Sequence, residues 1–327
     1  RVAIEGGGFD SASDALVSGN QLAALYYNSL TGELGGYGAM AGDDSTSEEF
    51  ASTYDEAAQG AVDALDGIVD AFTGLAERTA TSVHNHRSAN GASVYGQPQV
   101  YDGSGSLGED PVDVAAYSVP SSLGGQDEDT PDFWDEIVAH LEGFAWPNAD
   151  VDRVRQAATT WSDAAADVGR LSDYCDSATT HLEGQQSPEV PLARSAIADL
   201  GTQCDELADV CTALSEACSG YADQVEEHRE IIKGIVQDMA IEAGISIVAG
   251  AVVGFFSFGA GAAGGAAIAG WRIASAARKI LAALRALKAA QKANAVRKLE
   301  TALDKAKEVL EKIRRFFGRG RRRDPDG

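Results

Sequence analysis

Within residues 1–90, apolar residues recur three and four positions apart over two long stretches, which is the spacing of one face of an α-helix. The first stretch covers about 10–33 and the second about 47–86. Glycines interrupt the pattern between them, and the run DDSTSEE at 43–49 supplies helix-capping and acidic first-turn signals. The pattern predicts an antiparallel helix-turn-helix hairpin over residues 1–90.

Glycine, serine, proline and aspartate dominate residues 91–130, which is typical of a linker or of a loop laid on the surface. Helical spacing resumes over 131–241, with a turn at Pro147 and an interruption at GQQSPEVP. This predicts a second hairpin in tandem with the first. Alanine-rich helices and an aromatic content of 7% favour an all-α fold.

The last helix of the second hairpin alternates leucine with cysteine at heptad spacing, through Cys204, Cys211 and Cys218. This spacing places the three thiols on one inward face, too far apart along the axis to share a metal ion. Cys175 and Cys204 lie equally far from the turn between their helices, so they face each other. We expect them within disulfide range, bonded in an oxidising compartment, whereas the state of Cys211 and Cys218 stays open.

Residues 242–271 include 29 consecutive positions without charge, enough to cross a bilayer core of about 30 Å. Gly250 and Gly254, and Gly261 and Gly265, form GxxxG pairs that allow close helix packing. Two readings stay open. The segment enters a membrane, with copies of itself as partners or with its halves folded together, or it is buried in a water-soluble bundle.

Residues 272–318 form a basic amphipathic pattern with an apolar heptad seam, and 319–327 form a basic tail. The tail has three readings: a site for anionic lipid, a junction to a further domain, or a solvated linker.

Charge divides the chain into two parts of opposite sign. Residues 1–227 carry seven basic and 41 acidic side chains, whereas residues 228–327 carry 19 basic and nine acidic ones. The acidic body repels anionic partners, so any such partner should meet the C-terminal hundred residues. We expect no nucleic-acid partner.

No metalloprotease motif, phosphate loop, nucleophile elbow or CxxC pair occurs in the sequence. His84 and His86 lie on different helix faces, and the other histidines lack a nearby acid-base partner in the sequence. We expect neither a cofactor nor a metal, and no enzymatic activity from this chain itself.

The run FWDEIVAHLEGFAWPNADVDRVRQAATTW, followed by alanine-rich helices and a Gly/Ala segment, resembles CpnT-like proteins. These are actinobacterial type VII secretion substrates with a WXG-like helical domain ahead of a variable toxin. GAMAGDDSTSEEFASTYDEAAQG resembles a signature of related effectors. The residues that carry the resemblance are Gly42, Asp43, Asp44, Phe50, Trp146, Pro147 and Trp161.

The resemblance implies export as a folded helical module, with a small WXG-like helical partner or the secretion machinery as the binding partner. It also implies a secreted or envelope location, with membrane association and homo-oligomers as further expectations, and delivery of a C-terminal toxin domain beyond this chain. The alternatives are a soluble coiled-coil scaffold with a buried Gly/Ala helix, and an enzyme whose catalytic domain lies outside the sequence.

Overall fold

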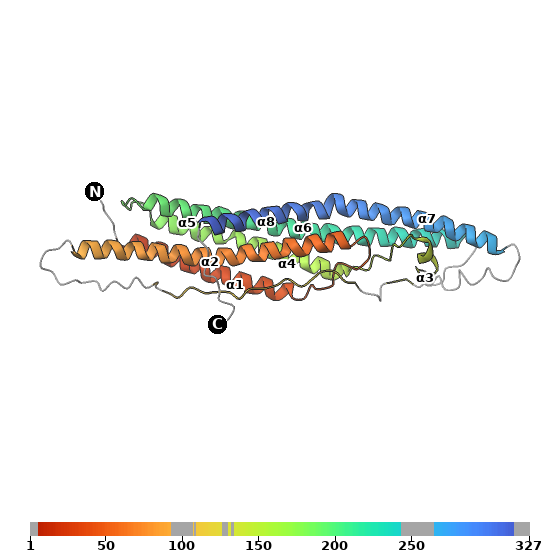
Figure 1. The fold of residues 1–327 in the computed structure, drawn as a ribbon, viewed down its shortest axis with the longest axis horizontal. Coiled ribbons are helices and arrows are strands. Elements are labelled where there is room, and N and C mark those ends of the chain that lie inside the picture. Colours follow the sequence, from red (N-terminus) through yellow and green to blue (C-terminus); the bar gives the residue numbers. More distant parts are fainter. Residues whose placement is uncertain are drawn as a thin grey trace.

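The computed structural model of the chain describes residues 6–92, 107, 109–125, 130–131, 134–242 and 265–316. Within these ranges the regular structure is helical, with a single β-bridge between Gly42 and Gly124. The predicted all-α class is confirmed. The helices lie side by side in an elongated bundle (Figure 1).

The first hairpin consists of α1 (Gly6–Leu34) and α2 (Glu48–Ala92). Leu16 and Tyr27 of α1 and Leu65 and Phe72 of α2 belong to one buried apolar cluster, as the helical spacing predicts. Asn20 is a polar residue on the inner face of α1. Its side chain is fully buried and donates to the backbone oxygen of Val69 at 3.1 Å, which satisfies a group that would otherwise be costly to bury.

The second hairpin consists of α3 (Trp134–Ile137) with a short 3₁₀ turn (Val138–His140), α4 (Val151–Gly169), α5 (Leu171–His181) and α6 (Val190–Glu242). Asp150 caps α4 by accepting a hydrogen bond from the backbone nitrogen of Arg153 at 3.0 Å. The chain leaves α4 and enters α5 through Arg170, which keeps a helical conformation. The two helices therefore act as one long arm packed along α6.

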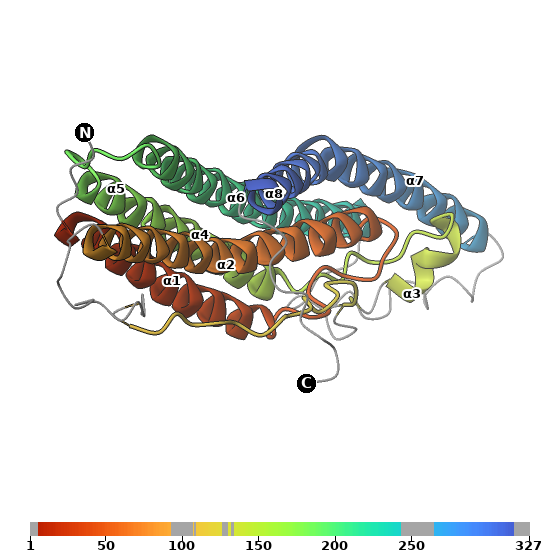
Figure 2. The same cartoon turned by 60° about the vertical axis from the view of Figure 1, so that its left-hand side comes forward.

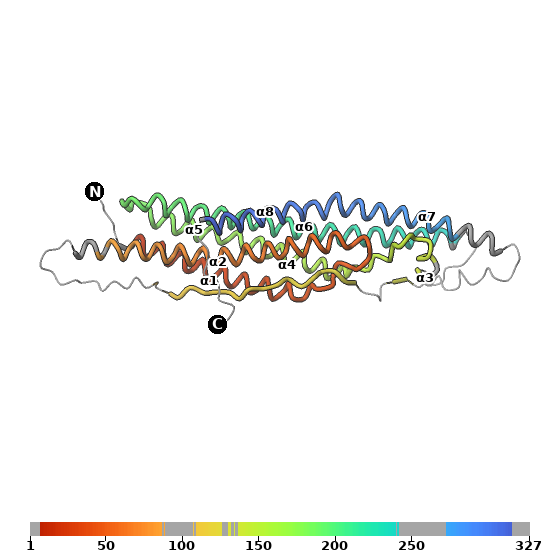
Figure 3. The backbone as a smooth tube through the Cα atoms, in the orientation of Figure 1, coloured from red at the N-terminus to blue at the C-terminus, as the bar shows by residue number. Residues whose placement is uncertain are grey.

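Residues 109–125, here called the strap, run in extended form along the first hairpin (Figure 3). Two side-chain amides hold it. Asn20 accepts from the backbone nitrogen of Val112 at 2.7 Å, and Gln59 accepts from that of Val119 at 2.9 Å. Tyr27 adds a bond from its hydroxyl to the backbone oxygen of Ala115 at 2.8 Å. Because the amides imitate a neighbouring strand, this polar segment is fixed to a helical surface.

Both hairpins share one hydrophobic core. α1 packs on α2, α4 and α5, and α6 packs on α2, α4 and α5. The core therefore depends on the docking of one hairpin on the other, and not on two separate cores in series.

The C-terminal arm consists of α7 (Gly265–Gln291), a π-helical segment (Lys292–Val296) and α8 (Arg297–Phe316). α8 packs on α2 and α6 and extends the main core, while α7 packs on the C-terminal part of α6. A second, smaller cluster joins Trp134, Trp146, Ile232 and Ile280, from the α3 region, α6 and α7. Figure 2 shows α7 and α3 gathered at one end of the rod.

Most of the predicted apolar membrane segment, including Gly250, Gly254 and Gly261, lies outside the described residues, as does the tail at 319–327. Gly265 is the first residue of α7. Among the described helices, none combines the length and apolar character that crossing a bilayer requires.

Two glycines within helices give a test of the packing between α1 and α2. A Cβ atom added at Gly19 would lie 2.5 Å from the Phe72 ring, whereas one at Gly74 would meet nothing within 4 Å. Gly74→Ala should raise the free energy of unfolding by about 0.5–1 kcal/mol through helix propensity. Gly19→Ala should lower it by about 1–3 kcal/mol through overpacking. Urea denaturation of both variants measures the difference, and a stabilising Gly19→Ala would contradict the close approach.

Candidate functional site

The turn between α1 and α2 has a fixed conformation that depends on Gly42 and Asp44. Gly42 has a φ of +93°, and a Cβ atom there would lie 2.7 Å from the Ser47 hydroxyl and 3.0 Å from Asn148 Oδ1. Asp44 is 2% exposed and accepts hydrogen bonds from the Thr46 backbone nitrogen at 2.8 Å and from the Ser47 hydroxyl at 2.5 Å. The turn therefore needs both a glycine and a short carboxylate.

Asn148, ahead of α4, joins this turn to the second hairpin. Its Oδ1 accepts from the backbone nitrogen of Asp43 at 3.1 Å, and its Nδ2 donates to Asp43 Oδ1 at 2.8 Å. Next to this pair, the backbone nitrogen of Asp150 donates to the oxygen of Met40 at 2.9 Å. The end of the strap joins from the other side through the bridge between Gly42 and Gly124. We call this meeting of the two turns and the strap the turn junction.

An aromatic cluster lies beneath the turn junction. Phe50 stacks on Tyr221 of α6 with ring centroids 3.7 Å apart, and the Tyr221 hydroxyl donates to the backbone oxygen of Ala41 at 2.5 Å. Trp161 of α4 donates to the Tyr54 hydroxyl at 3.0 Å. Burial raises the pKa of both Tyr54 and Tyr221 well above the usual tyrosine range. Both hydroxyls therefore act as neutral hydrogen-bonding groups that orient the helices.

Arg229 of α6 fixes the segment that precedes α4. Its guanidinium donates to the backbone oxygens of Pro147 and Ala149, both at 2.7 Å. Trp146, 3% exposed, meets Trp134 edge to face with centroids 5.3 Å apart. The two tryptophans that carry the resemblance thus belong to different clusters, since Trp161 lies in the main core and Trp146 in the smaller one.

The C-terminal arm lies close to the turn junction. Lys288 of α7 donates to the backbone oxygen of Ser45 at 2.9 Å, and Lys292 pairs with Glu49 at 2.6 Å. Arg285 pairs with Glu142 at 2.6 Å. Two of these basic side chains therefore pair with acidic residues of the chain's own body, and Lys288 meets a backbone oxygen.

The structure places the predicted signature residues in the turn junction and in the two apolar clusters next to it. Gly42, Asp43 and Asp44 form the turn, Phe50 lies beneath it, and the others approach from the second hairpin: Trp146, Pro147 and Trp161. Their shared functional role stays a prediction.

Sequence reasoning missed the residues that make the connections, namely Asn148, Tyr54, Tyr221 and Arg229. Asn148 carried a local signal because it follows Pro147 in a turn, and Tyr221 carried one because it lies on the heptad seam of its helix. The partners of these residues gave none, since a buried aromatic or an isolated cation on a long helix has no sequence feature that names its partner.

Comparison with known proteins identifies the second hairpin. Residues 125–271 match the family model described as WXG100 like domain. We call this range the WXG100-like domain. Its range runs from the end of the strap through α3, α4, α5 and α6 into the start of α7, so the first hairpin and most of the basic arm lie outside it.

Curated relatives support the same conclusion. The outer membrane channel protein CpnT of Mycobacterium tuberculosis is 28% identical over 229 residues, which are 69% of this chain and 26% of CpnT. The protein of that name in Mycobacterium bovis gives the same values. The Mycobacterium avium protein named Putative NAD(+)--arginine ADP-ribosyltransferase Mav is 26% identical over 198 residues, 58% of this chain and 22% of Mav. No solved structure matches. The resemblance to a CpnT-like WXG-type domain is confirmed.

The WXG100-like domain holds all four cysteines, which are buried thiols in the structure. Cys175 of α5 and Cys204 of α6 are hydrogen-bonded to each other, and this contact, with burial, raises the pKa of Cys204. Burial alone raises the pKa of Cys211 to about 12. The side chains of Cys175 and Cys204 therefore face each other, and the formation of a disulfide between them stays a prediction.

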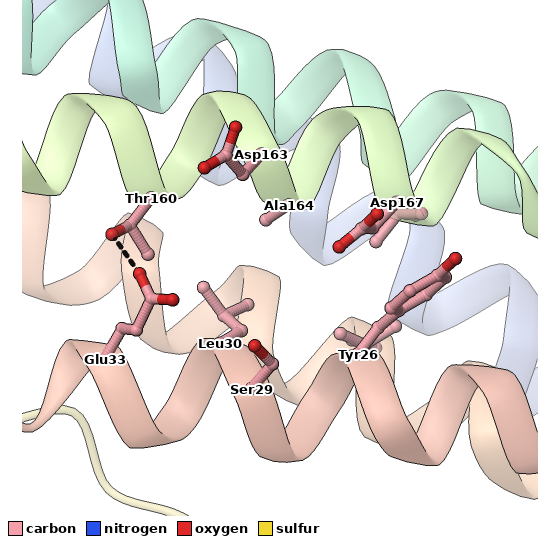
Figure 4. A pocket seen from close by; sticks show the side chains of 10 residues that line it. Tyr26, Ser29, Leu30, Glu33, Thr160, Asp163, Ala164 and Asp167 are labelled. Carbon is pink, nitrogen blue, oxygen red and sulfur yellow. Dashed lines mark hydrogen bonds between the residues drawn. The ribbon is translucent and has the colours of Figure 1, made fainter.

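A crevice between α1 and the WXG100-like domain gathers acidic side chains (Figure 4). Glu33 of α1 accepts from Thr160 of α4 at 2.5 Å, and Asp163 and Asp167 lie beside Thr160 on α4, across the crevice from α1. The crevice encloses about 30 Å³, which is room for about one water molecule. Among the described residues no group of three or more potential ligands could hold a metal. The crevice is too small for an organic substrate.

At the far end of the bundle, Ser187 and Glu189 contact His86 of α2. Both residues approach the same nitrogen, Nε2, with the Ser187 hydroxyl at 3.3 Å. A catalytic triad needs the acid on one ring nitrogen and the nucleophile on the other. The cluster therefore clasps the end of α2 to the turn before α6.

Mild oxidation should join Cys175 to Cys204 and raise the free energy of unfolding by about 3–4 kcal/mol, because the bond shortens the unfolded chain's free loop. Cys211 and Cys218 should remain thiols, since burial keeps them protonated. Peptide mapping identifies the bond, and urea denaturation measures its effect. Cys175→Ser serves as the control that cannot form it. A bond to Cys211 instead would contradict the facing geometry.

The cluster of His86, Ser187 and Glu189 predicts that the free energy of unfolding depends on pH. Burial acts to raise the pKa of Glu189, but hydrogen bonds from Ser187, His86 and Ser82 outweigh it and lower the pKa to about 2. The carboxylate therefore stabilises the fold above the usual glutamate pKa of about 4.3, and the contribution fades as the pH falls toward 2.

Glu189→Gln should lower the free energy of unfolding at pH 7 by about 1 kcal/mol or less, because the side chain is 37% exposed and screened by solvent. The difference from wild type should narrow as the pH falls from about 4.5 to about 2. Denaturant titrations across that range measure it, and a gap that widens on acidification would show that the sign is wrong.

Proposed function

We propose that this chain is the helical export and delivery module of a type VII-secreted effector or toxin. The observation that carries the proposal is the turn junction. The signature residue Asp43 is joined there by two hydrogen bonds to Asn148, which lies 105 positions further along the chain and directly after the signature residue Pro147. The junction ties the WXG100-like domain to the first hairpin, so that the secretion machinery would meet a preformed helical surface.

The packing of the hairpins bears on the identity of the partner. The first hairpin lies along α4, α5 and α6 within the same core as the WXG100-like domain. That face of the domain is filled by this chain itself. A separate small helical partner would therefore bind to another face, or the machinery would recognise the module directly.

The module delivers a further domain in this proposal. The chain spans 26% of the CpnT relatives and 22% of Mav, and the names of those proteins refer to a channel and to an ADP-ribosyltransferase. We propose a secreted or envelope-bound protein whose toxin domain follows the basic tail. Residues 242–271 would enter a membrane, with the pairs of Gly250 with Gly254 and Gly261 with Gly265 packing copies against one another.

A second candidate is a soluble helical scaffold. The docking of the basic arm on the acidic body favours it, because the arm already has an anionic partner within the chain. Export distinguishes the candidates, since a scaffold has no reason to leave the cell through a type VII system.

The test is secretion of an epitope-tagged chain from an actinobacterium, with and without a working type VII system. Wild-type protein should reach the culture filtrate only when the system works. Asn148→Ala should reduce export severalfold, because the loss of its two partly buried hydrogen bonds to Asp43 weakens the turn junction by about 1–3 kcal/mol.

Ser52→Ala is the matched control. Ser52 is exposed on α2 just beyond the junction, and its hydroxyl bonds only within its own helix, to the oxygen of Glu49. It should be exported like wild type. Secretion that is independent of the type VII system would refute the proposed function.

A further inference from the structure

α8 is an amphipathic helix whose apolar face is stored in a groove. Leu299, Val309 and Ile313 are 4% exposed or less and pack in the main core against α2 and α6. Figure 2 shows α8, in dark blue, lying over these helices. The helix therefore hides the face with which an isolated amphipathic helix would bind a surface.

The cations of α8 meet a row of carboxylates on α6. Lys298 pairs with Glu216 at 2.6 Å, Lys305 with Asp209 at 2.7 Å and Lys312 with Glu206 at 3.0 Å. The lysines are seven residues apart, so they lie on one side of α8 and contact the antiparallel α6 in sequence. Because these side chains are 27–73% exposed, each pair holds weakly and is screened by salt.

The surface of α2 that contacts α8 allows the two helices to approach closely. A Cβ atom at Gly60 would lie 3.4 Å from Ala306 Cβ, and one at Gly67 would lie 3.3 Å from Ile313 Cγ2. Such an interface has small residues at its closest points. The side of α8 that faces α2 is therefore held by close backbone approach.

The joint between α7 and α8 disfavours the docked state. Residues 292–296 are π-helical, and neighbouring Gln291 is 1% exposed. Its side-chain oxygen and nitrogen find no hydrogen-bond partner among the described residues. A buried amide without partners costs free energy that is regained if the arm swings out and the amide meets water. π-helical turns inside α-helices occur frequently at functional sites.

We propose that α8 is a stored membrane-surface helix, which leaves the groove and lays its apolar face and its cations on an anionic lipid bilayer. In the docked state the lysines of α8 pair with carboxylates of α6, and in the membrane-bound state the same lysines pair with lipid phosphates. Over residues 272–316 the arm has 13 basic and four acidic residues, whereas the body is strongly acidic and repelled by such a surface. The inference extends the proposed delivery function by naming the lipid-contacting element.

A reversible lock tests the proposal. Gly60→Cys with Ala306→Cys places two thiols at a Cβ separation close to that of natural disulfides, about 3.5–4.5 Å. In vesicle flotation at low salt, the reduced double variant should bind vesicles that contain phosphatidylglycerol at least tenfold more than the oxidised form does. Vesicles of phosphatidylcholine alone should bind neither form. Peptide mapping confirms the bond, and circular dichroism confirms that both forms are folded.

A second variant weakens the groove without altering α8. Glu206→Gln, Asp209→Asn and Glu216→Gln together should increase binding to anionic vesicles severalfold. The control removes three exposed carboxylates elsewhere, through Asp152→Asn, Asp173→Asn and Asp176→Asn. The control variant changes the net charge by the same amount as the groove variant. It therefore measures how much binding increases simply because the protein is less strongly repelled by anionic vesicles.

Equal vesicle binding by the locked and reduced forms would place the lipid contact elsewhere and overturn the proposal. So would groove and control variants that bind alike. Release of α8 on reduction, seen by hydrogen exchange but without lipid binding, would also overturn it and point to an acidic protein partner. Since secretion is measured separately, failure here leaves the export proposal standing, and failure of export leaves the vesicle result interpretable.

Discussion

The apolar stripe of α6 has to be covered along its 53 residues, and this constraint organises the rest of the structure. A helix of that length is stable in water only when its apolar face is packed. α4 and α5 cover one side of its first part, α2 and α8 cover another, and α7 with the α3 region covers its C-terminal part. The first hairpin and the C-terminal arm thus both serve to cover the apolar face of α6.

The turn junction sits where α6 passes from the main core to the smaller cluster. Tyr221 reaches the first turn through Ala41, while Arg229, two helical turns later, reaches the backbone around Pro147. Two residues of one helix therefore set the positions of two turns that are remote in sequence. This arrangement gives the WXG100-like domain a defined neighbour on its own chain.

The opposite charges of the body and the arm have a structural consequence. Lysines of the C-terminal arm pair with carboxylates of α2 and α6, so the first anionic surface that the arm meets is the protein itself. The pairs are exposed and individually weak, whereas the apolar contacts beneath them are short-range. Charge therefore selects where the arm docks, and packing keeps it there.

The sequence by itself determined the elements of this protein. Helical spacing located the long helices, Asp44 and the acidic run after it marked the start of α2, and Pro147 marked the turn before α4. These features depend on contacts three and four residues apart, which are readable along the chain. The facing of Cys175 and Cys204 also followed from equal distances to a turn.

Only the tertiary structure decided which faces meet. Alanine and leucine stripes on α1, α2, α4 and α6 are nearly interchangeable, so nothing local selects one docking of the hairpins over another. The sequence of the strap does not show what holds it in place, because its partners, the amides of Asn20 and Gln59, lie far upstream. Asn148 with Asp43, and Lys305 with Asp209, likewise depend on geometry created when separate helices pack, since a hydrogen bond or an ion pair acts over a few ångströms of space and carries no signal along the chain.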